Sequence, residues 1–167
     1  MDEPQAGRTL VLGLGNPLMG DDGVGLAALR ELTRRYELPE GVDLLEGGTA
    51  GLTLLAHLEG YTRILIADCA ALGRTPGQAV RIDRSQLGAA FSQCLSPHEL
   101  GLNDLLGALE LLGERPEQVT VIGMEPGSLE MNLELSDPVS KGLPAMVAVI
   151  AKELADWGIP LRRHIAH

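Results

Sequence analysis

Short apolar runs alternate with amphipathic stretches through most of this sequence, and the alternation restricts the chain to a layered α/β fold. Residues 9–14 form a short apolar run bounded by glycine, as in a strand that is buried on both faces of a sheet. In the stretch that begins at Val24, apolar and charged side chains fall on opposite sides of a helix, and Pro39 and Gly41 end it. This order indicates the first strand and helix of a β-α repeat.

The same alternation predicts the other elements. Strands are expected at residues 42–45, 63–68, 79–82 and 119–123, and helices at residues 52–58, 99–112 and 138–157. We interpret residues 79–82 as an edge strand, and the tail 162–167, which has no periodicity, as a frayed terminus. A chain of 167 residues is long enough for one core. We therefore predict a single α/β domain over residues 1–167, with flexible ends at 1–8 and 158–167.

Composition and charge exclude several classes of function. Aromatic residues make up 2% of the chain and the formal net charge is −10, so base stacking and attraction to phosphate are both poorly supported. We expect neither a nucleic-acid nor a membrane partner. No apolar run could span a bilayer, and residues 1–5 are acidic where a secretory signal is basic, which predicts a cytoplasmic protein. Cys69 and Cys94 are too few for a disulfide framework, so free thiols are expected.

The loop between the first predicted strand and helix is rich in glycine but ends in two carboxylates. The segment Gly13–Gly25 resembles a nucleotide fingerprint only superficially, because Asp21 and Asp22 stand where such a motif offers bare N–H groups to a phosphate. The positive end of the helix keeps both carboxylates ionised. Capping the helix accounts for one aspartate better than for two, so the pair indicates a cation-binding site.

Two other polar positions follow predicted strands or begin a predicted helix. Asp68 closes the apolar run 64–68, and His98 lies in Ser96–Glu99, which has the form of a capping box. Taken singly, an aspartate that caps a turn and a histidine exposed at a helix start remain open alternatives. Together, Asp22, Asp68 and His98 supply two carboxylates and an imidazole to one sheet edge, which suits an open site for a divalent metal.

The glycine-rich loop is one of several motifs that occur in a defined order. They are Gly13–Gly25, Glu46–Thr49, Ile66–Asp68 and Ser96–Leu102, followed by Gly123–Pro126 and Leu135–Val139. Together they resemble the motifs of the hydrogenase maturation endopeptidases, and the resemblance covers residues 9–155. It implies a three-layer domain in which a mixed, mostly parallel five-stranded sheet lies between helices.

The resemblance also implies an activity and a set of site residues. Members of this family are proteases that remove a C-terminal peptide from the large-subunit precursor of a nickel-iron hydrogenase. Residue by residue, Asp22, Asp68 and His98 fall on the family's nickel-contacting positions. Asp22 stands where the family often has Glu, and Glu46 where it often has Asp, so both positions keep a carboxylate.

The resemblance implies that the nickel arrives with the precursor, already bound by its cysteine thiolates. Three ligands without a thiolate form an open, exchangeable site, so we expect no tightly bound permanent cofactor. For the cleavage, we expect Asp22 or Asp68 to orient or deprotonate water, and the sequence does not assign these roles.

The turn Glu46, Gly47, Gly48 and Thr49 is the expected substrate-binding segment. Its two glycines could bring bare backbone close to an extended peptide, while the alternative is that Thr49 simply caps the next helix.

Other functions stay open at this stage. A non-catalytic adaptor or assembly chaperone for the nickel precursor would use the same three residues and cut nothing. A thiol protease based on Cys94 and His98 is another alternative. The run 13–17 also resembles the start of peptidyl-tRNA hydrolases, whose following motif is absent here. We expect the protein to work as a monomer.

Overall fold

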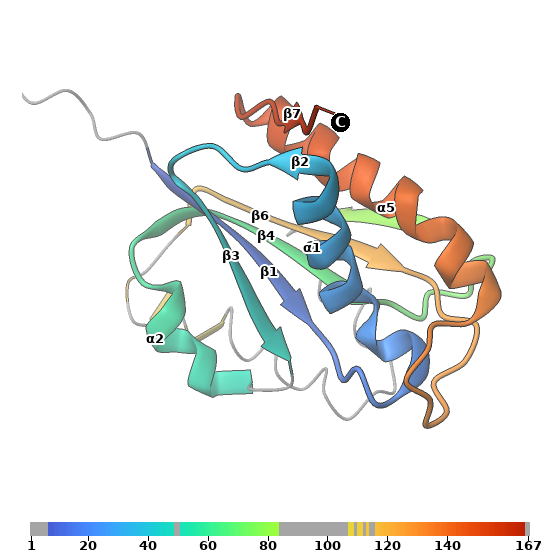
Figure 1. Ribbon diagram of the computed structural model, residues 1–167. Coiled ribbons are helices and arrows are strands. Elements are labelled where there is room, and N and C mark those ends of the chain that lie inside the picture. Colours follow the sequence, from blue (N-terminus) through green and yellow to red (C-terminus); the bar gives the residue numbers. More distant parts are fainter. Residues whose placement is uncertain are drawn as a thin grey trace, which may run out of the picture.

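A five-stranded sheet forms the middle layer of the molecule (Figure 1). The computed structural model describes residues 7–48, 51–83, 107–108, 110–111, 113 and 116–165. The strands of the sheet are β1 (Arg8–Leu14), β3 (Val42–Gly48), β4 (Tyr61–Cys69), β5 (Ala79–Asp83) and β6 (Gln118–Met124), in the order β3-β1-β4-β6-β5. The pairs β1–β3, β1–β4 and β4–β6 are parallel, whereas β5 runs antiparallel to β6 at one edge. The expected mixed, mostly parallel sheet is confirmed.

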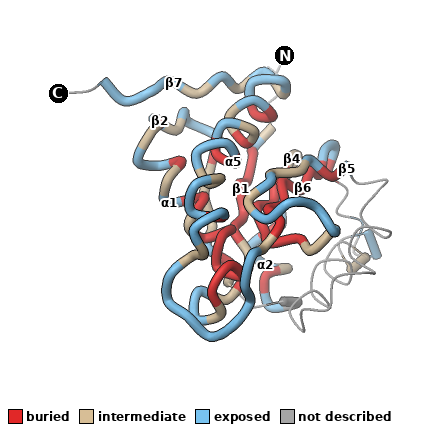
Figure 2. The backbone as a smooth tube through the Cα atoms, turned by 90° about the vertical axis from the view of Figure 1, so that its right-hand side faces the viewer, coloured by how far each residue is buried: buried red, intermediate tan, exposed pale blue. Residues whose placement is uncertain are grey.

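Helices cover both faces of this sheet (Figures 1 and 2). The helical elements are η1 (Gly20–Gly23), α1 (Val24–Arg35), η2 (Gly51–Leu54), α2 (Leu55–Leu58) and α5 (Asp137–Asp156). The helices α1 and α5 pack together on one face, and the α2 segment lies on the other. The helix expected at 52–58 is a 3-10 turn followed by one α-helical turn, and most of the helix expected at 99–112 lies outside the described residues. In the part of the chain described, no helix combines the length and the apolar character needed to cross a bilayer.

Alternate residues of the central strands feed two separate cores. On β1, Leu10 and Leu12 pack with Leu54 on the α2 face, whereas Val11 packs with Leu29 on the α1 face. All five side chains are at most 4% exposed, and each stabilises the fold by about 1.5–3 kcal/mol through burial. Because both faces of the sheet are covered, the strands are apolar runs and not alternating ones.

The two ends of the domain differ from expectation. A second, two-stranded sheet pairs β2 (Tyr36–Glu37) with β7 (Arg162–Arg163), and the N–H of His164 donates to the Arg35 carbonyl at 2.9 Å. The expectation of a frayed terminus was therefore wrong for these residues. A two-residue strand has no periodicity to detect, and its partner lies more than a hundred residues away. At the other end, Arg8 already belongs to β1 and pairs with Tyr61.

The first turn of α1 lies against the ends of β1 and β4. A Cβ atom added at Gly25 would clash with the carbonyl oxygens of Leu14 and Ala67. Glycine therefore sets how closely the helix approaches the sheet. This approach brings η1, which precedes the helix, into contact with β4.

We predict that Gly25→Ala lowers the free energy of unfolding by about 1–3 kcal/mol, because the helix must move away from both strands. Urea unfolding of the purified variant measures the change. The matched control is Gly107→Ala, since a Cβ there meets nothing within 4 Å. That helical position should be neutral or gain up to about 1 kcal/mol. Equal stabilities for the two variants would contradict this account.

A buried carboxylate links α5 to the antiparallel edge of the sheet. Glu153 is 5% exposed, and its carboxylate accepts hydrogen bonds from Arg81 at 2.7 and 3.0 Å and from the Thr120 hydroxyl at 3.0 Å. The hydrogen bond from Arg81 lowers the pKa of Glu153 and, with the bond from Thr120, outweighs burial, which raises it. A carboxyl whose pKa is lower in the folded state stabilises the fold above its unfolded pKa.

We predict that Glu153→Gln costs roughly 2 kcal/mol of stability at neutral pH, because Arg81 loses its charged partner. The difference from wild type should shrink as the pH falls below about 4.3, where the unfolded carboxyl protonates, and vanish below the folded pKa. Denaturant unfolding over a pH series checks this. The control Asp156→Asn removes an exposed ion pair with Lys152 and should cost less than about 0.5 kcal/mol at any pH.

Candidate functional site

Four parallel strands, β1, β3, β4 and β6, end at the same edge of the sheet, and the candidate residues that the structure describes lie there. In the register of the sheet, Gly13 of β1 is opposite Glu46 of β3 and Ala67 of β4. The chain leaves β1 for α1 on one face and leaves β3 for α2 on the other. The connections that leave the carboxyl ends of β1 and β3 therefore go to opposite faces of the sheet. In open α/β folds, ligands bind at such a switch point.

Asp22 and Asp68 are both nearly buried at this edge, each 6% exposed. Asp22 lies in η1, and its Oδ2 accepts a hydrogen bond from the N–H of Asn16 at 2.9 Å. Asp68 is the penultimate residue of β4, and its Oδ1 accepts from the N–H of Cys69 at 2.7 Å. Because η1 contacts β4, the two carboxylates belong to elements that touch. The arrangement offers two oxygen donors of the kind that hard and borderline divalent ions accept.

His98 lies outside the described residues, as does Cys94, so the expected imidazole and the thiol have no described position. Among the residues that are described, no three His, Cys, Asp or Glu side chains are grouped so that they could hold a metal. The described part of the site thus consists of the Asp22 and Asp68 carboxylates.

The residues of the expected substrate-binding turn have different surroundings. Glu46 points to α1, where its Oε1 lies 3.0 Å from the Nε of Arg30. Gly47 faces the core: an added Cβ would lie 2.9 Å from Leu12 Cδ1 and 3.0 Å from Leu54 Cδ1. Core packing therefore explains the glycine at position 47 without any ligand.

Gly48 differs from its neighbour because, among the described residues, a Cβ added there would meet nothing nearer than the Gly15 carbonyl oxygen at 4.0 Å. Its φ of +56° favours glycine, and its carbonyl accepts the N–H of Gly15 at 2.9 Å, which ties the ends of β3 and β1 together. Thr49, the last residue of the turn, lies outside the described residues.

Asp21 has a role that its position in the sequence does not reveal. Its carboxylate has no solvent exposure and accepts four hydrogen bonds from a loop more than a hundred residues away. The donors are the N–H groups of Gly127, Ser128 and Ser136, at 2.8, 2.9 and 2.7 Å, and the Ser136 hydroxyl, at 2.7 Å. Neither η1 nor α1 has a side-chain cap, so the interpretation that one of these aspartates caps the helix was wrong.

The hydrogen bonds to Asp21 also decide its charge. Burial alone raises the pKa of Asp21, but the bonds from the Ser136 hydroxyl and the three N–H groups together lower it below the ordinary value. The carboxylate therefore stays ionised and fastens the loop 127–136 to η1, next to Asp22.

Glu125 also fastens a loop at the carboxyl ends of the strands, by accepting backbone N–H groups. It follows β6, is 7% exposed, and accepts the N–H groups of Leu72 and Gly73 at 2.7 and 3.2 Å. It thereby fixes the loop that follows Asp68 and β4. The motifs Gly123–Pro126 and Leu135–Val139 contain Glu125 and Ser136, but the sequence does not reveal their hydrogen bonds, because a loop N–H donor can come from any residue except proline.

We predict that Asp21→Asn lowers the free energy of unfolding by about 2–4 kcal/mol, because an amide NH2 would face N–H donors in a buried position. Urea denaturation measures the loss. The matched control is again Asp156→Asn, an exposed carboxylate, which should change stability by less than about 0.5 kcal/mol. A loss of similar size in both variants would mean that the loop is held in another way.

Known proteins share this fold. The family model described as "Hydrogenase maturation protease" (HycI) matches residues 26–153. The hydrogenase 2 maturation protease of Escherichia coli K12 is 38% identical over 146 residues, which cover 86% of this chain and 89% of that protein. The solved structure of the hydrogenase maturating endopeptidase HybD from E. coli has a TM-score of 0.88 and 34% identity, covering 94% of this chain and 98% of that one. For the [NiFe] hydrogenase maturation protease HybD of Thermococcus kodakarensis, the TM-score is 0.73 and the identity 33%, over 87% of this chain and 98% of that one.

Proposed function

The chain belongs to the hydrogenase maturation protease family and is a hydrolase, and on that premise we propose that it cleaves the C-terminal peptide from the nickel-loaded large-subunit precursor of a nickel-iron hydrogenase. The observation that carries the proposal is the pair of nearly buried carboxylates, Asp22 and Asp68, on contacting elements at the switch edge of the sheet. The relatives are named for hydrogenase maturation, which supports a hydrogenase precursor as the substrate.

We propose that Asp22, Asp68 and His98 contact the nickel that the precursor brings. Two carboxylates and an imidazole give oxygen and nitrogen donors, which suit a borderline divalent ion. This set has no thiolate and few ligands, so it binds the ion firmly only when ligands from the precursor complete the coordination. The metal is then part of the substrate, and the protease alone holds no permanent cofactor.

The same carboxylates are proposed to serve the hydrolysis. One of them accepts a proton from a water molecule as the oxygen attacks the peptide carbonyl, and the proton passes to the amine as the C–N bond breaks. The backbone N–H groups of Asn16 and Cys69 hold Asp22 and Asp68 in place, which fixes the direction of their oxygens.

The end of β3 is proposed to receive the tail of the precursor. Among the described strands, this one stands at the outer end of the sheet order, and a Cβ added at its last residue, Gly48, would meet no described atom nearer than 4.0 Å. An extended peptide can approach such a strand closely and use its backbone groups. The segment 46–49 is therefore the proposed substrate-binding segment, with Gly47 serving the core.

We predict that intact-mass analysis of the nickel-loaded precursor shows loss of a C-terminal peptide with wild-type protein, and that nickel-free precursor stays intact. Asp22→Asn, Asp68→Asn and His98→Ala should each slow cleavage by about a hundredfold or more, because each removes a group that contacts the metal or the water. The control Asp43→Asn alters an exposed carboxylate that pairs with Arg8 on β1, and it should cleave like wild type.

The other outcomes separate the remaining hypotheses. A stable complex with the precursor and no change in mass would identify an adaptor and refute a protease. Full cleavage by His98→Ala would show that His98 is not a required metal ligand. Cleavage of nickel-free precursor would refute the role of the metal.

A further inference from the structure

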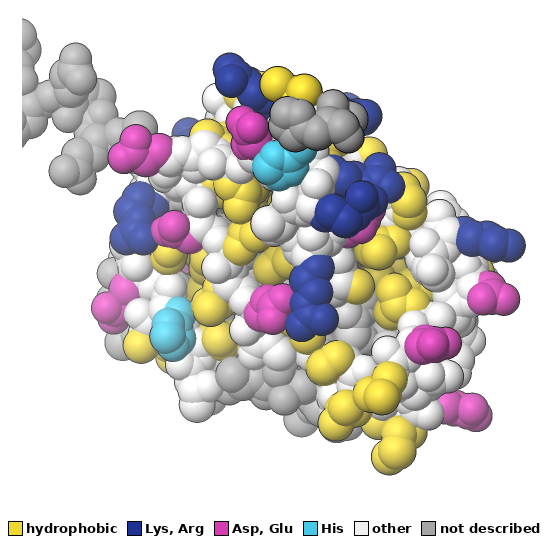
Figure 3. All heavy atoms as spheres, in the orientation of Figure 1, with side chains coloured by type: hydrophobic (Ala, Val, Ile, Leu, Met, Phe, Trp, Pro, Cys, Tyr) yellow, Lys and Arg dark blue, Asp and Glu magenta, His cyan; other side chains and the backbone are white. Residues whose placement is uncertain are grey.

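Two loops beside the candidate site expose large apolar side chains. Among the described residues, six large hydrophobic side chains are exposed, and four of them, Leu18, Leu129, Met131 and Leu133, lie on the loops 16–19 and 127–136. Met131 and Leu133 are 83% and 80% exposed. Figure 3 shows hydrophobic side chains gathered at the lower right, over the loops that precede α1 and α5. Apolar side chains concentrated in this way mark a binding surface more often than single exposed leucines do.

These loops are held firmly and do not expose the side chains by fraying. Backbone bonds join them at two points: the N–H of Gly20 donates to the Asn132 carbonyl at 2.9 Å, and the N–H of Asn132 donates to the Leu18 carbonyl at 3.0 Å. The buried Asp21 carboxylate fastens the same loop at both of its ends. The exposed side chains are therefore presented in a fixed arrangement.

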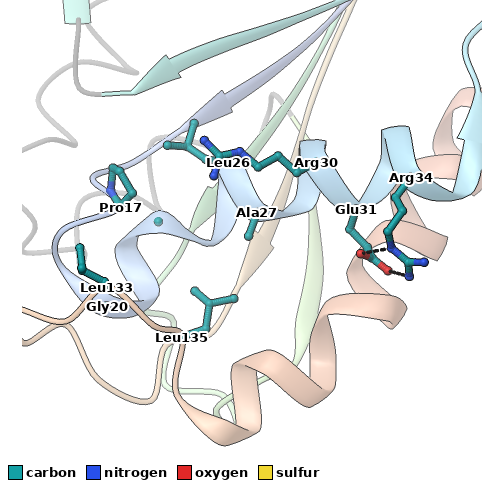
Figure 4. Close-up of a pocket in the computed structure, with 10 residues that line it drawn as sticks. Pro17, Gly20, Leu26, Ala27, Arg30, Glu31, Arg34, Leu133 and Leu135 are labelled. Carbon is teal, nitrogen blue, oxygen red and sulfur yellow. Dashed lines mark hydrogen bonds and ion pairs between the residues drawn. The ribbon is translucent and has the colours of Figure 1, made fainter.

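A hollow of about 290 Å³ lies directly behind these loops (Figure 4). Its floor and sides are largely apolar, and its far side carries Arg30 and Arg34 of α1; the apolar lining consists of Pro17, Leu26, Ala27, Leu133 and Leu135. This volume accepts an aliphatic side chain of a partner. The guanidinium groups at its side are already ion-paired, Arg30 with Glu46 and Arg34 with Glu31, which also lines the hollow, so the hollow offers a partner apolar contact.

We propose that Leu18, Met131 and Leu133, with the hollow behind them, form a docking surface for the folded body of the hydrogenase precursor. The proposal rests on the proposed function. The loop 16–19 runs directly into η1 and Asp22, so a substrate whose tail reaches that edge brings its own body against the loop. The partner is thus identified as a protein with an exposed aliphatic side chain near the base of its C-terminal tail.

The size of the docking surface favours a transient partner over a second copy of this chain. The patch consists of four exposed apolar side chains, and the largest apolar patch on a typical monomer covers roughly 300–600 Å². Stable complexes bury roughly 800 Å² on each partner. A protease must release its product after every cleavage, and a small apolar patch beside the site suits that requirement.

Attachment at two places has a kinetic signature. Contact between the docking surface and the precursor body is the same before and during the cleavage step, so its loss raises KM and leaves kcat unchanged. Loss of a group at the reacting bond lowers kcat instead. The docking surface is therefore distinguishable from the carboxylate site by kinetics alone.

The test compares wild type with the double variant Met131→Ser and Leu133→Ser. Initial cleavage rates over a range of nickel-loaded precursor concentrations give KM and kcat, and equilibrium binding of nickel-free precursor gives a Kd that does not depend on cleavage. We expect KM and Kd to rise about tenfold, with kcat unchanged. The matched control is Ile165→Ser, which is 77% exposed beside His164 at the other end of α1, a helix about 18 Å long, and it should match wild type.

The outcomes separate this proposal from the proposed function. If wild type and double variant bind and cleave alike, the docking surface is refuted and the protease stands. If the double variant loses binding but wild type never cleaves the precursor, the docking surface stands and the protease is refuted. If sedimentation shows that wild type self-associates and the double variant does not, the surface joins two copies of this chain and the proposal is overturned.

Discussion

The buried carboxylate of Asp21 fixes the geometry on which the candidate site depends. Four hydrogen bonds converge on it where no solvent reaches, and they outweigh the cost of burying a charge. Glu125 repeats the device on the other side of the edge with the N–H groups of Leu72 and Gly73. Loops at the carboxyl end of a sheet have no ladder of their own, so ionised side chains supply the order that strands and helices supply elsewhere.

Most of the regular structure could be predicted because it depends on local patterns. The run 9–14 and the amphipathic stretch from Val24 are found as β1 and α1. Strand β5 at the edge was predicted too, although its antiparallel direction needed the structure. The pairing of Tyr36 with Arg163 escaped prediction because each of the two strands has only two residues, too few to show a periodic pattern, and the strands are far apart in the chain.

The candidate site was less predictable than the fold, for a related reason. Family motifs single out Asp22 and Asp68, and the structure places both at the carboxyl ends of the strands. The motifs do not say which of the other residues in them serve a ligand and which serve the packing of the fold. Gly25 and Gly47 serve close packing against strands and core, although they read as parts of a ligand loop. Asp21 reads as a helix cap and instead binds a distant loop, because the identity of a carboxylate does not say which N–H groups surround it.

The separation between Asp21 and its partners has a consequence for how the site comes into being. Gly127 and Ser136 lie 106 and 115 residues after Asp21, and all five strands of the sheet precede them in the chain. The rim of the site therefore forms only when segments far apart in the chain have been brought together. A partly synthesised or partly unfolded chain has no such rim and cannot align a substrate. Alignment of a substrate at this rim is in this way conditional on completion of the fold.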